Sequence, residues 1–235
     1  MRYAIYFTPG RDHPLTRTTA KWLGRDPFSG ELGTPPEISC LQPAEIAYYT
    51  AAARRYGFHA TLKAPFRLAK GETEASLNEA LDLFAGSVAP VTIPRLEIRR
   101  LDNFLALVPA APLPGLNKLA DDVVCAFERF RAPLTEAELE RRNPDSLSPV
   151  EFRNLMRWGY PYVFETFRFH MTLTGRVTPE ESVRIIAAIE EFFGAILKDP
   201  VTVDGLALFV EREAGAPFCV QSYHPLRSQQ ERKIA

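Results

Sequence analysis

The 235-residue sequence has little of several residue types on which common chemistries depend. It contains three cysteines, two tryptophans, three methionines and four histidines. The cysteines, Cys40, Cys125 and Cys219, are odd in number and show no metal-ligand spacing, which argues against a disulfide framework and a zinc site. We interpret them as buried free thiols in a reducing environment, and we expect the protein to be cytoplasmic.

A large net charge of either sign is also absent. The chain has 28 basic and 29 acidic side chains, which give a formal net charge of −1. A long nucleic acid is held by an extended basic surface, so we expect no long nucleic-acid partner and only local binding of phosphate. No apolar run is long enough for a signal peptide or a membrane span, because prolines interrupt the longest apolar region, 104–116. We therefore expect no membrane partner.

One short pattern, Phe-His-x-Thr-Leu, occurs twice. The first copy contains His59 and Thr61, and the second contains His170 and Thr172. Side chains alternate faces along a strand, so each histidine would share a face with the threonine two positions later. A lone histidine is more often structural than catalytic, but here two of only four histidines carry the same pattern. A pair of merely structural histidines is therefore the weaker interpretation.

Further polar residues continue the two faces. In the first copy Lys63 would lie on the same face as Thr61, and in the second Arg168 and Thr174 would flank the motif on the face of His170. The intervening apolar residues would point into a core. A lysine or arginine beside each motif could hold a phosphate or a second anionic group.

The sequence that follows each motif also repeats. Each copy is followed by a helical pattern, which ends at Gly86 in the first copy and at Gly194 in the second. Two short strand patterns follow each helix, and residues 90–98 align with residues 200–208. The order strand, helix, strand, strand therefore occurs twice. It predicts an α+β fold that is duplicated, pseudo-symmetric and two-lobed, with antiparallel sheets, outer helices and a central cleft.

We expect a single bilobal domain over residues 1–235, with lobe one centred on 56–109 and lobe two on 167–225. Residues 132–166 lie outside the repeat and form a helical insertion. It contains a capping box at Ser148 that predicts a short helix up to about Trp158. An insertion rich in aromatic residues and arginine, placed just before the second motif, could form a flap over a substrate. The alternative is a surface helix with solvated charges.

Two facing histidines and two threonines suit the cleavage of a phosphodiester. One imidazole can accept a proton from the nucleophile while the other protonates the leaving oxygen, and the symmetric repeat does not say which does which. The threonine hydroxyls can donate to the non-bridging phosphate oxygens. No Asp/Glu cluster accompanies either histidine, and no glycine-rich phosphate loop or Gly-x-Ser-x-Gly elbow is present. We therefore expect neither a metal nor a cofactor.

The paired motifs on a repeated frame resemble the two-histidine phosphoesterase superfamily, over roughly residues 3–225. In that superfamily each half supplies one His-x-Thr or His-x-Ser to a central cleft, without metal. The strings 55–66, 157–162 and 167–175 resemble the branch encoded beside the carbon–phosphorus lyase genes of bacterial phosphonate breakdown. The motifs and the resemblance together give catalytic His59 and His170, and substrate-binding Thr61, Thr172, Lys63, Arg168, Arg55 and Tyr56.

The resemblance implies a metal-independent cyclic phosphodiesterase whose substrate is a small cyclic ribose phosphate, such as 5-phosphoribosyl 1,2-cyclic phosphate. A 5-phosphate on that substrate would explain the spare cations near the motifs, Arg54 among them. Two alternatives stay open. One is an enzyme of RNA ends, acting on a 2′,3′-cyclic phosphate or a 2′,5′ linkage. The other is a non-catalytic module that binds a nucleotide or a sugar phosphate.

Overall fold

The computed structural model describes residues 1–227, which contain seven α-helices and nine β-strands. The helices are α1 (Pro14–Leu23), α2 (Pro43–Tyr56), α3 (Glu74–Ala85), α4 (Pro114–Ala126), α5 (Glu136–Glu140), α6 (Pro149–Trp158) and α7 (Pro179–Phe193). The strands are β1 (Arg2–Phe7), β2 (Ala60–Phe66), β3 (Val91–Ile93), β4 (Leu96–Leu101), β5 (Phe104–Pro109), β6 (Met171–Thr172), β7 (Val201–Val203), β8 (Gly205–Glu211) and β9 (Cys219–Pro225).

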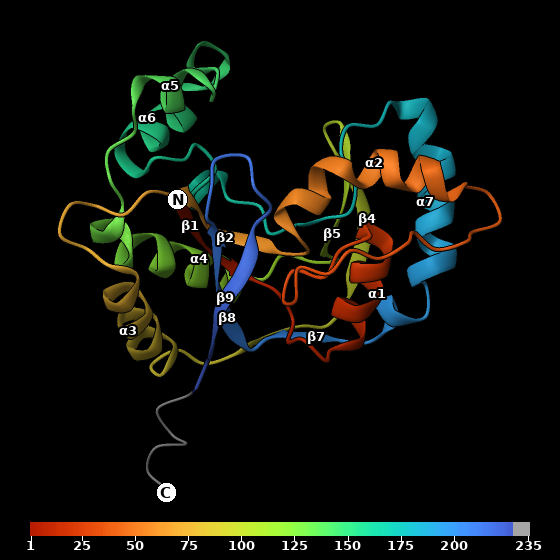
Figure 1. Cartoon of the computed structure of the whole chain (residues 1–235), viewed down its shortest axis with the longest axis horizontal. Coiled ribbons are helices and arrows are strands. Elements are labelled where there is room, and N and C mark those ends of the chain that lie inside the picture. Colours follow the sequence, from red (N-terminus) through yellow and green to blue (C-terminus); the bar gives the residue numbers. More distant parts are fainter. Residues whose placement is uncertain (228–235) are drawn as a thin grey trace, which may run out of the picture.

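Seven of the strands form one antiparallel sheet in the order β4-β5-β6-β2-β1-β8-β9, and β3 pairs with β7 in a second, two-stranded sheet. Helix α4 packs on β2, α3 packs on β8 and β9, and α7 packs on β4. Helices α3 and α7 therefore cover opposite ends of the large sheet (Figure 1). The predicted α+β class, with antiparallel sheets and outer helices, is confirmed.

Residues that are equivalent in the repeat meet one another at two places. Ala60 of β2 pairs with Met171 of β6, and Thr92 of β3 pairs with Thr202 of β7. The hydroxyls of Thr92 and Thr202 lie 3.1 Å apart. Because each residue faces its own counterpart across an antiparallel pair, a pseudo-two-fold axis passes through both places. The predicted duplication is therefore visible in the strand register.

The two halves of the chain exchange their hairpins. The hairpin β4–β5 comes from the first half but extends the large sheet beyond β6, which carries the second motif. The hairpin β8–β9 comes from the second half but pairs with β1, the neighbour of β2. Residues 56–109 and 167–225 thus each supply strands on both sides of the pseudo-two-fold axis. The division into lobes with those ranges stays a prediction.

The two faces of the large sheet are covered to different extents. Ile5 and Phe7 of β1 point into the main core, which all the longer helices except α6 complete. Tyr6 points the other way, into a small cluster with Phe209 and Phe218. Alternation along β1 therefore places a buried tyrosine on the less covered face, and the candidate site lies on that face.

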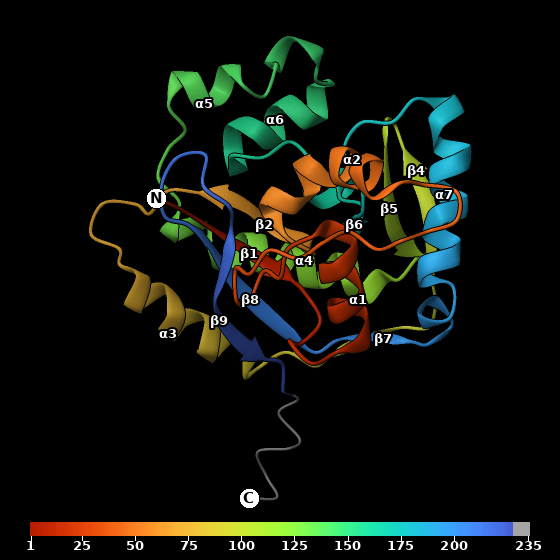
Figure 2. The ribbon, with the colours of Figure 1, turned by 45° about the vertical axis from the view of Figure 1, so that its right-hand side comes forward.

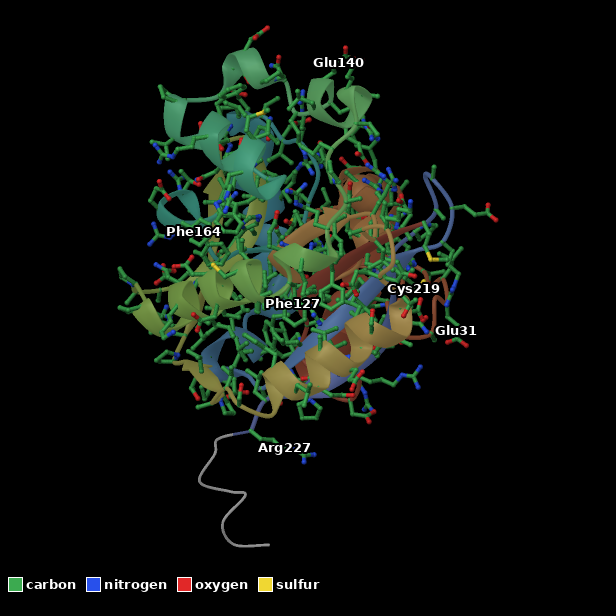
Figure 3. The ribbon with its side chains drawn as sticks, turned by 90° about the vertical axis from the view of Figure 1, so that its left-hand side faces the viewer. Glu31, Phe127, Glu140, Phe164, Cys219 and Arg227 are labelled. Carbon is green, nitrogen blue, oxygen red and sulfur yellow. The ribbon has the colours of Figure 1, made fainter. Side chains whose placement is uncertain are left out.

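The insertion, residues 132–166, contains α5 and α6 and lies at one end of the molecule (Figure 2). Ser148 caps α6 by accepting a hydrogen bond from the Glu151 amide, and Gly159 ends the helix with φ of 74°. Only glycine adopts this left-handed conformation without strain, so the helix stops here. The predicted helix is confirmed. Glu140, in α5, lies at the end of the molecule opposite Arg227 (Figure 3).

The three cysteines are free, as predicted, but the prediction that they are buried is wrong. Cys125 is exposed, and Cys40 and Cys219 are half-buried. The apolar stripe of α4, which includes Leu119 and Val123, faces the core, so Cys125 falls on the outer side of the helix. Within residues 1–227 no helix has both the length and the hydropathy of a membrane-spanning segment.

Candidate functional site

Both histidines and both threonines of the repeated motif line a single cavity of about 340 Å³. The pairing of Ala60 with Met171 explains this convergence. When the antiparallel register is continued by one residue in each direction, His59 lies opposite Thr172 and His170 lies opposite Thr61. Each histidine thus has the threonine of the other half as its cross-strand neighbour, and the two halves form one site.

The two imidazoles are held in the same way. Nδ1 of His59 lies 2.9 Å from the Gly57 carbonyl oxygen, and Nδ1 of His170 lies 2.8 Å from the Arg168 carbonyl oxygen. A carbonyl oxygen only accepts hydrogen bonds, so we assign the proton of each neutral imidazole to Nδ1. Nε2 then carries the lone pair, and in both rings it is left for a ligand.

The surroundings of the two imidazoles differ. The ring of His59 stacks on the ring of Tyr6, with centroids 3.9 Å apart and an interplanar angle of 21°, and the Phe209 ring lies 6.1 Å away. The ring of His170 has a tilted contact with Phe104 at 5.6 Å. His59 is therefore the more closely packed of the two, because β1 supplies it with an aromatic face that His170 does not have.

These surroundings shift the pKa of both histidines. Burial lowers the pKa of His59 to about 4; the bond to Gly57 opposes this shift, and the nearby His170 adds to it. Burial also lowers the pKa of His170, against the opposing effect of its bond to Arg168. Desolvation disfavours the charged imidazolium, so both rings are neutral at pH 7 in the free protein.

Lys63 does not share the cavity face with Thr61, so that prediction is wrong. Irregularities in the β1–β2 register set Lys63 opposite Ile5, while Thr61 pairs with Tyr6. The extra residues in β2 are β-bulges, which change the alternation that a regular strand would keep. The buried ammonium of Lys63 instead donates to the Glu128 carboxylate at 2.9 Å, on the side of α4.

The cations just before the first motif are placed differently from one another. Arg55 donates to Oε1 of Glu211 at 2.6 Å, and Arg2 donates to both oxygens of the same carboxylate. Arg2 and Tyr56 line the cavity, whereas Arg55 does not. The guanidinium of Arg54 bonds to backbone carbonyl oxygens of α1 and α2 and does not reach the cavity.

A second cavity of about 520 Å³ adjoins the first. The two share Thr61, Phe104, Tyr160 and His170, so this part of the repeated motifs lies at their junction. Arg168 lines the second cavity only. The second cavity also contains three carboxylates, those of Asp102, Glu151 and Glu165.

Several residues that line the first cavity were not identified from the sequence. They are Arg2, Tyr6, Asn103, Phe104, Arg142, Tyr160 and Arg176. Arg142 and Tyr160 belong to the insertion, whose arginine and aromatic content was the available signal. Their arrival at the site depends on packing between distant segments, which no local pattern encodes.

In the part of the chain that the structure describes, no group of three or more His, Cys, Asp or Glu side chains is placed to hold a metal ion. The expectation that the protein needs no metal stays a prediction. It is decided by measuring activity after treatment with a chelator.

A family model with the description "Protein of unknown function (DUF1045)" matches residues 61–219. This range begins at Thr61, two residues after the first motif histidine, and includes the insertion and the whole second motif.

Two curated relatives are both named ribose 1,5-bisphosphate phosphokinase PhnN. The one from Janthinobacterium sp. (strain Marseille) is 40% identical over 235 residues, which cover 98% of this chain and 52% of the relative. The one from Laribacter hongkongensis (strain HLHK9) is 38% identical over 218 residues, covering 93% of this chain and 50% of the relative. The chain thus spans about half the length of the curated relatives it matches.

Three solved structures align with 97% of the chain. TT0787 of Thermus thermophilus has a TM-score of 0.46 at 16% identity, with all of that chain covered. A structure described as a phosphoesterase has a TM-score of 0.42 at 16% identity, with 99% of that chain covered. E. coli LigT complexed with 3′-AMP has a TM-score of 0.42 at 14% identity, with 98% covered. These likenesses are distant, and we base the function on the site itself.

Proposed function

Because the chain belongs to the DUF1045 family, whose description assigns no activity, we propose a function from the site: cleavage of a phosphodiester by two histidines. One observation carries this proposal. His59 and His170 lie in one cavity with Thr61 and Thr172, and each imidazole keeps Nε2 available because Nδ1 is bonded to a backbone carbonyl. This is the arrangement that paired acid–base catalysis requires.

We assign His59 as the general base and His170 as the general acid. The stack on Tyr6 and burial keep the imidazole of His59 neutral, which suits proton abstraction. His170 lies at the junction of the two cavities, in the more open surroundings. The negative charge of a bound phosphate would raise the pKa of His170, so that it can carry the proton it donates.

In this mechanism Nε2 of His59 takes a proton from a water molecule as the water oxygen bonds to phosphorus. The bond from phosphorus to the leaving oxygen breaks, and that oxygen receives the proton of His170. The product is a phosphomonoester, and each acid–base group contributes a factor of about 10²–10⁴ to the rate. Thr61 and Thr172 donate hydrogen bonds to the non-bridging oxygens as negative charge increases on them.

The substrate that we favour is a small cyclic ribose phosphate, with 5-phosphoribosyl 1,2-cyclic phosphate as the first candidate. The cavity volume lies at the lower end of the range for small-molecule sites, which is about 300–1,000 Å³. The curated relatives carry a name that refers to ribose 1,5-bisphosphate, a closely related sugar phosphate. The resemblance of the motif strings to the phosphonate-linked branch points to the same class of substrate.

A second candidate is the chemistry of RNA ends. The second cavity next to His170 is lined by the aromatic side chains of Phe104, Tyr160, Tyr162 and Phe167. Nucleobases stack on such side chains, so a nucleoside attached to the reacting phosphate would find a surface there. The same four motif residues would then act on a 2′,3′-cyclic phosphate or a 2′,5′ linkage.

Phosphorus NMR of chelator-treated protein tests these proposals. The protein is mixed separately with 5-phosphoribosyl 1,2-cyclic phosphate, with nucleoside 2′,3′-cyclic phosphates and with a 2′,5′-linked dinucleotide. The variants His59→Ala and His170→Ala serve as controls. We expect turnover of the ribose compound that both variants lose.

Each result points to one interpretation. Turnover of the nucleotides alone would favour RNA-end chemistry and reject the ribose substrate. Turnover that persists in both variants would reject the paired-histidine mechanism. Binding without turnover of any compound would favour a non-catalytic module, and activity that appears only after a metal is restored would reject metal independence.

A further inference from the structure

Three tyrosines and two arginines line the first cavity together with His59. We call Tyr6, Tyr56, Tyr160, Arg2 and Arg142 the tyrosine–arginine cluster, and all five line the cavity. Burial raises the pKa of Tyr6 well above its usual value, and each of the other four also acts on that pKa. The geometry agrees, because the rings of Tyr6 and Tyr56 lie 3.9 and 6.2 Å from the His59 ring, and all five side chains face the same cavity.

The hydroxyl of Tyr6 has no hydrogen-bond partner within residues 1–227. Tyr6 is only 1% exposed, yet its hydroxyl makes no hydrogen bond to any of residues 1–227. The hydroxyls of Tyr56 and Tyr160 are likewise without a partner within that range. All three side chains line one cavity, so their hydroxyls are available to donate hydrogen bonds to a ligand there.

The guanidinium of Arg142 also has no ion-pair partner among the described residues. Its guanidinium lies over the Tyr160 ring, 4.9 Å from the centroid, and forms no ion pair with any carboxylate of the described chain. An aromatic face orients a guanidinium but leaves its N–H donors available. Arg2, by contrast, is paired with the Glu211 carboxylate, which also pairs with Arg55. Two positive charges thus face one negative charge, and this group has a net charge of +1.

We propose that the tyrosine–arginine cluster binds a second phosphate group, a phosphomonoester on the same sugar as the cyclic phosphate. This inference rests on the proposed function, because it places the second phosphate relative to the reacting one. Phosphate oxygens accept hydrogen bonds from hydroxyls and from the forked N–H groups of a guanidinium. The second cavity is less suitable for a dianion, since its one arginine is accompanied by three carboxylates.

Tyr6 connects the cluster to the histidines of the proposed mechanism. Its ring stacks on the imidazole of His59, with centroids 3.9 Å apart, and both side chains line the same cavity. A phosphate held by the cluster would therefore share the cavity with the reacting phosphate. Burial raises the pKa of Tyr160 as it does that of Tyr6, so both hydroxyls keep the protons that they donate.

In this proposal the insertion contributes to substrate recognition. Arg142 and Tyr160 both belong to residues 132–166, which lie outside the repeat. The repeated motifs therefore supply the groups that break the phosphodiester in the proposed mechanism. The insertion supplies two of the five groups that would recognise the second phosphate, and β1 and the end of α2 supply the other three.

The test compares two substrates in matched variants. Ribose 1,2-cyclic phosphate is assayed with and without a 5-phosphate, using the wild type, Arg142→Gln and Arg141→Gln. Arg141 is the control, because it is exposed, bonds to the Ala137 carbonyl of its own helix and does not line the cavity. Losing a hydrogen bond to a charged group costs about 10- to 100-fold, so we expect kcat/KM for the 5-phosphorylated substrate to fall by that factor in Arg142→Gln, mainly through KM.

Two further comparisons make the result specific. The substrate without a 5-phosphate should be converted at the same rate by the wild type and both variants. Tyr6→Phe keeps the ring on His59 but removes the hydroxyl, so it should weaken the use of the 5-phosphorylated substrate alone. Equal losses on both substrates, or no loss on either, would overturn the proposal.

A binding measurement separates this proposal from the proposed function. If the wild type converts neither compound, the ribose substrate of the proposed function is rejected, and the cluster is judged by calorimetry with ribose 5-phosphate as the probe. Binding that is retained in His59→Ala and Arg141→Gln but weakened at least about tenfold in Arg142→Gln would support the subsite. Equal binding in Arg142→Gln and the wild type, or no binding to the wild type, would overturn it.

Discussion

His59 and His170 begin from the same sequence and end in different surroundings. Both follow a phenylalanine, and both are bonded through Nδ1 to the carbonyl two residues earlier. His59, however, is stacked on Tyr6, whereas His170 lies where two cavities meet. The duplicated segments set the shared geometry, and β1, which lies outside the repeat, makes the two rings unequal. A symmetric pair of histidines can thereby divide into a base and an acid.

Replacing either histidine should cause the largest loss of activity. His59→Ala and His170→Ala should each lower kcat for a cyclic phosphate by a factor of about 10²–10⁴. With a nitrophenyl phosphodiester, whose leaving group needs no proton, the loss should remain in His59→Ala and nearly disappear in His170→Ala. Steady-state rates with both substrates check this division. Equal losses in the two variants on the nitrophenyl ester would show that the rings are functionally equivalent.

Replacing Tyr6, the aromatic partner of His59, should make the surroundings of the two imidazoles more alike. Tyr6→Ala would let water reach the imidazole, so the pKa of His59 should move up from about 4 toward 6.5. The acidic limb of the kcat/KM profile should move upward with it, because a base is active only when deprotonated. Imidazole NMR titration and the pH–rate profile measure the shift, with Tyr6→Phe as the control that keeps the ring. An unchanged pKa in Tyr6→Ala would mean that the stack does not set it.

Lys63 and Thr174 are the repeat-equivalent residues at the ends of the two motif strings, and both bond to neighbouring segments of the fold. The Thr174 hydroxyl accepts a hydrogen bond from the Leu105 amide, and Lys63 is paired with Glu128. Lys63→Met should lower the free energy of unfolding by about 1–3 kcal/mol, because Glu128 loses its buried partner. It should change kcat less than about twofold. Urea unfolding and the rate assay test this. A large loss of kcat in a stably folded variant would show that Lys63 contributes to the reaction.

The last expected effect is the dependence of stability on pH. The pKa of His59 is about 4 in the folded protein and about 6.5 when unfolded, so between these values the unfolded chain binds more protons. The free energy of unfolding should therefore decrease as the pH falls from 6.5 to 4. The dependence should be weaker in His59→Gln than in the wild type, as measured by urea unfolding at pH 7 and pH 5. Equal slopes in the two proteins would assign the effect to other groups.

The sequence predicted what local patterns encode. The repeat of motif, helix and strands indicated a duplicated α+β fold, and the capping box at Ser148 indicated α6. The position of Lys63 could not be predicted, because the bulges in β2 arise from pairing with β1, far away in the sequence. For the same reason, nothing close to the first motif in the sequence indicates that Tyr6 would stack on His59.

The exchanged hairpins mean that the two halves of this chain are interlocked. A fragment that ends after β5 would carry a hairpin whose neighbour, β6, is missing, and a fragment that starts before β6 would carry β8–β9 without β1. Each fragment would expose unpaired strand edges, which associate with any available strand. Each half therefore completes the sheet of the other, and the segment between β5 and β6 keeps the two halves joined within one molecule.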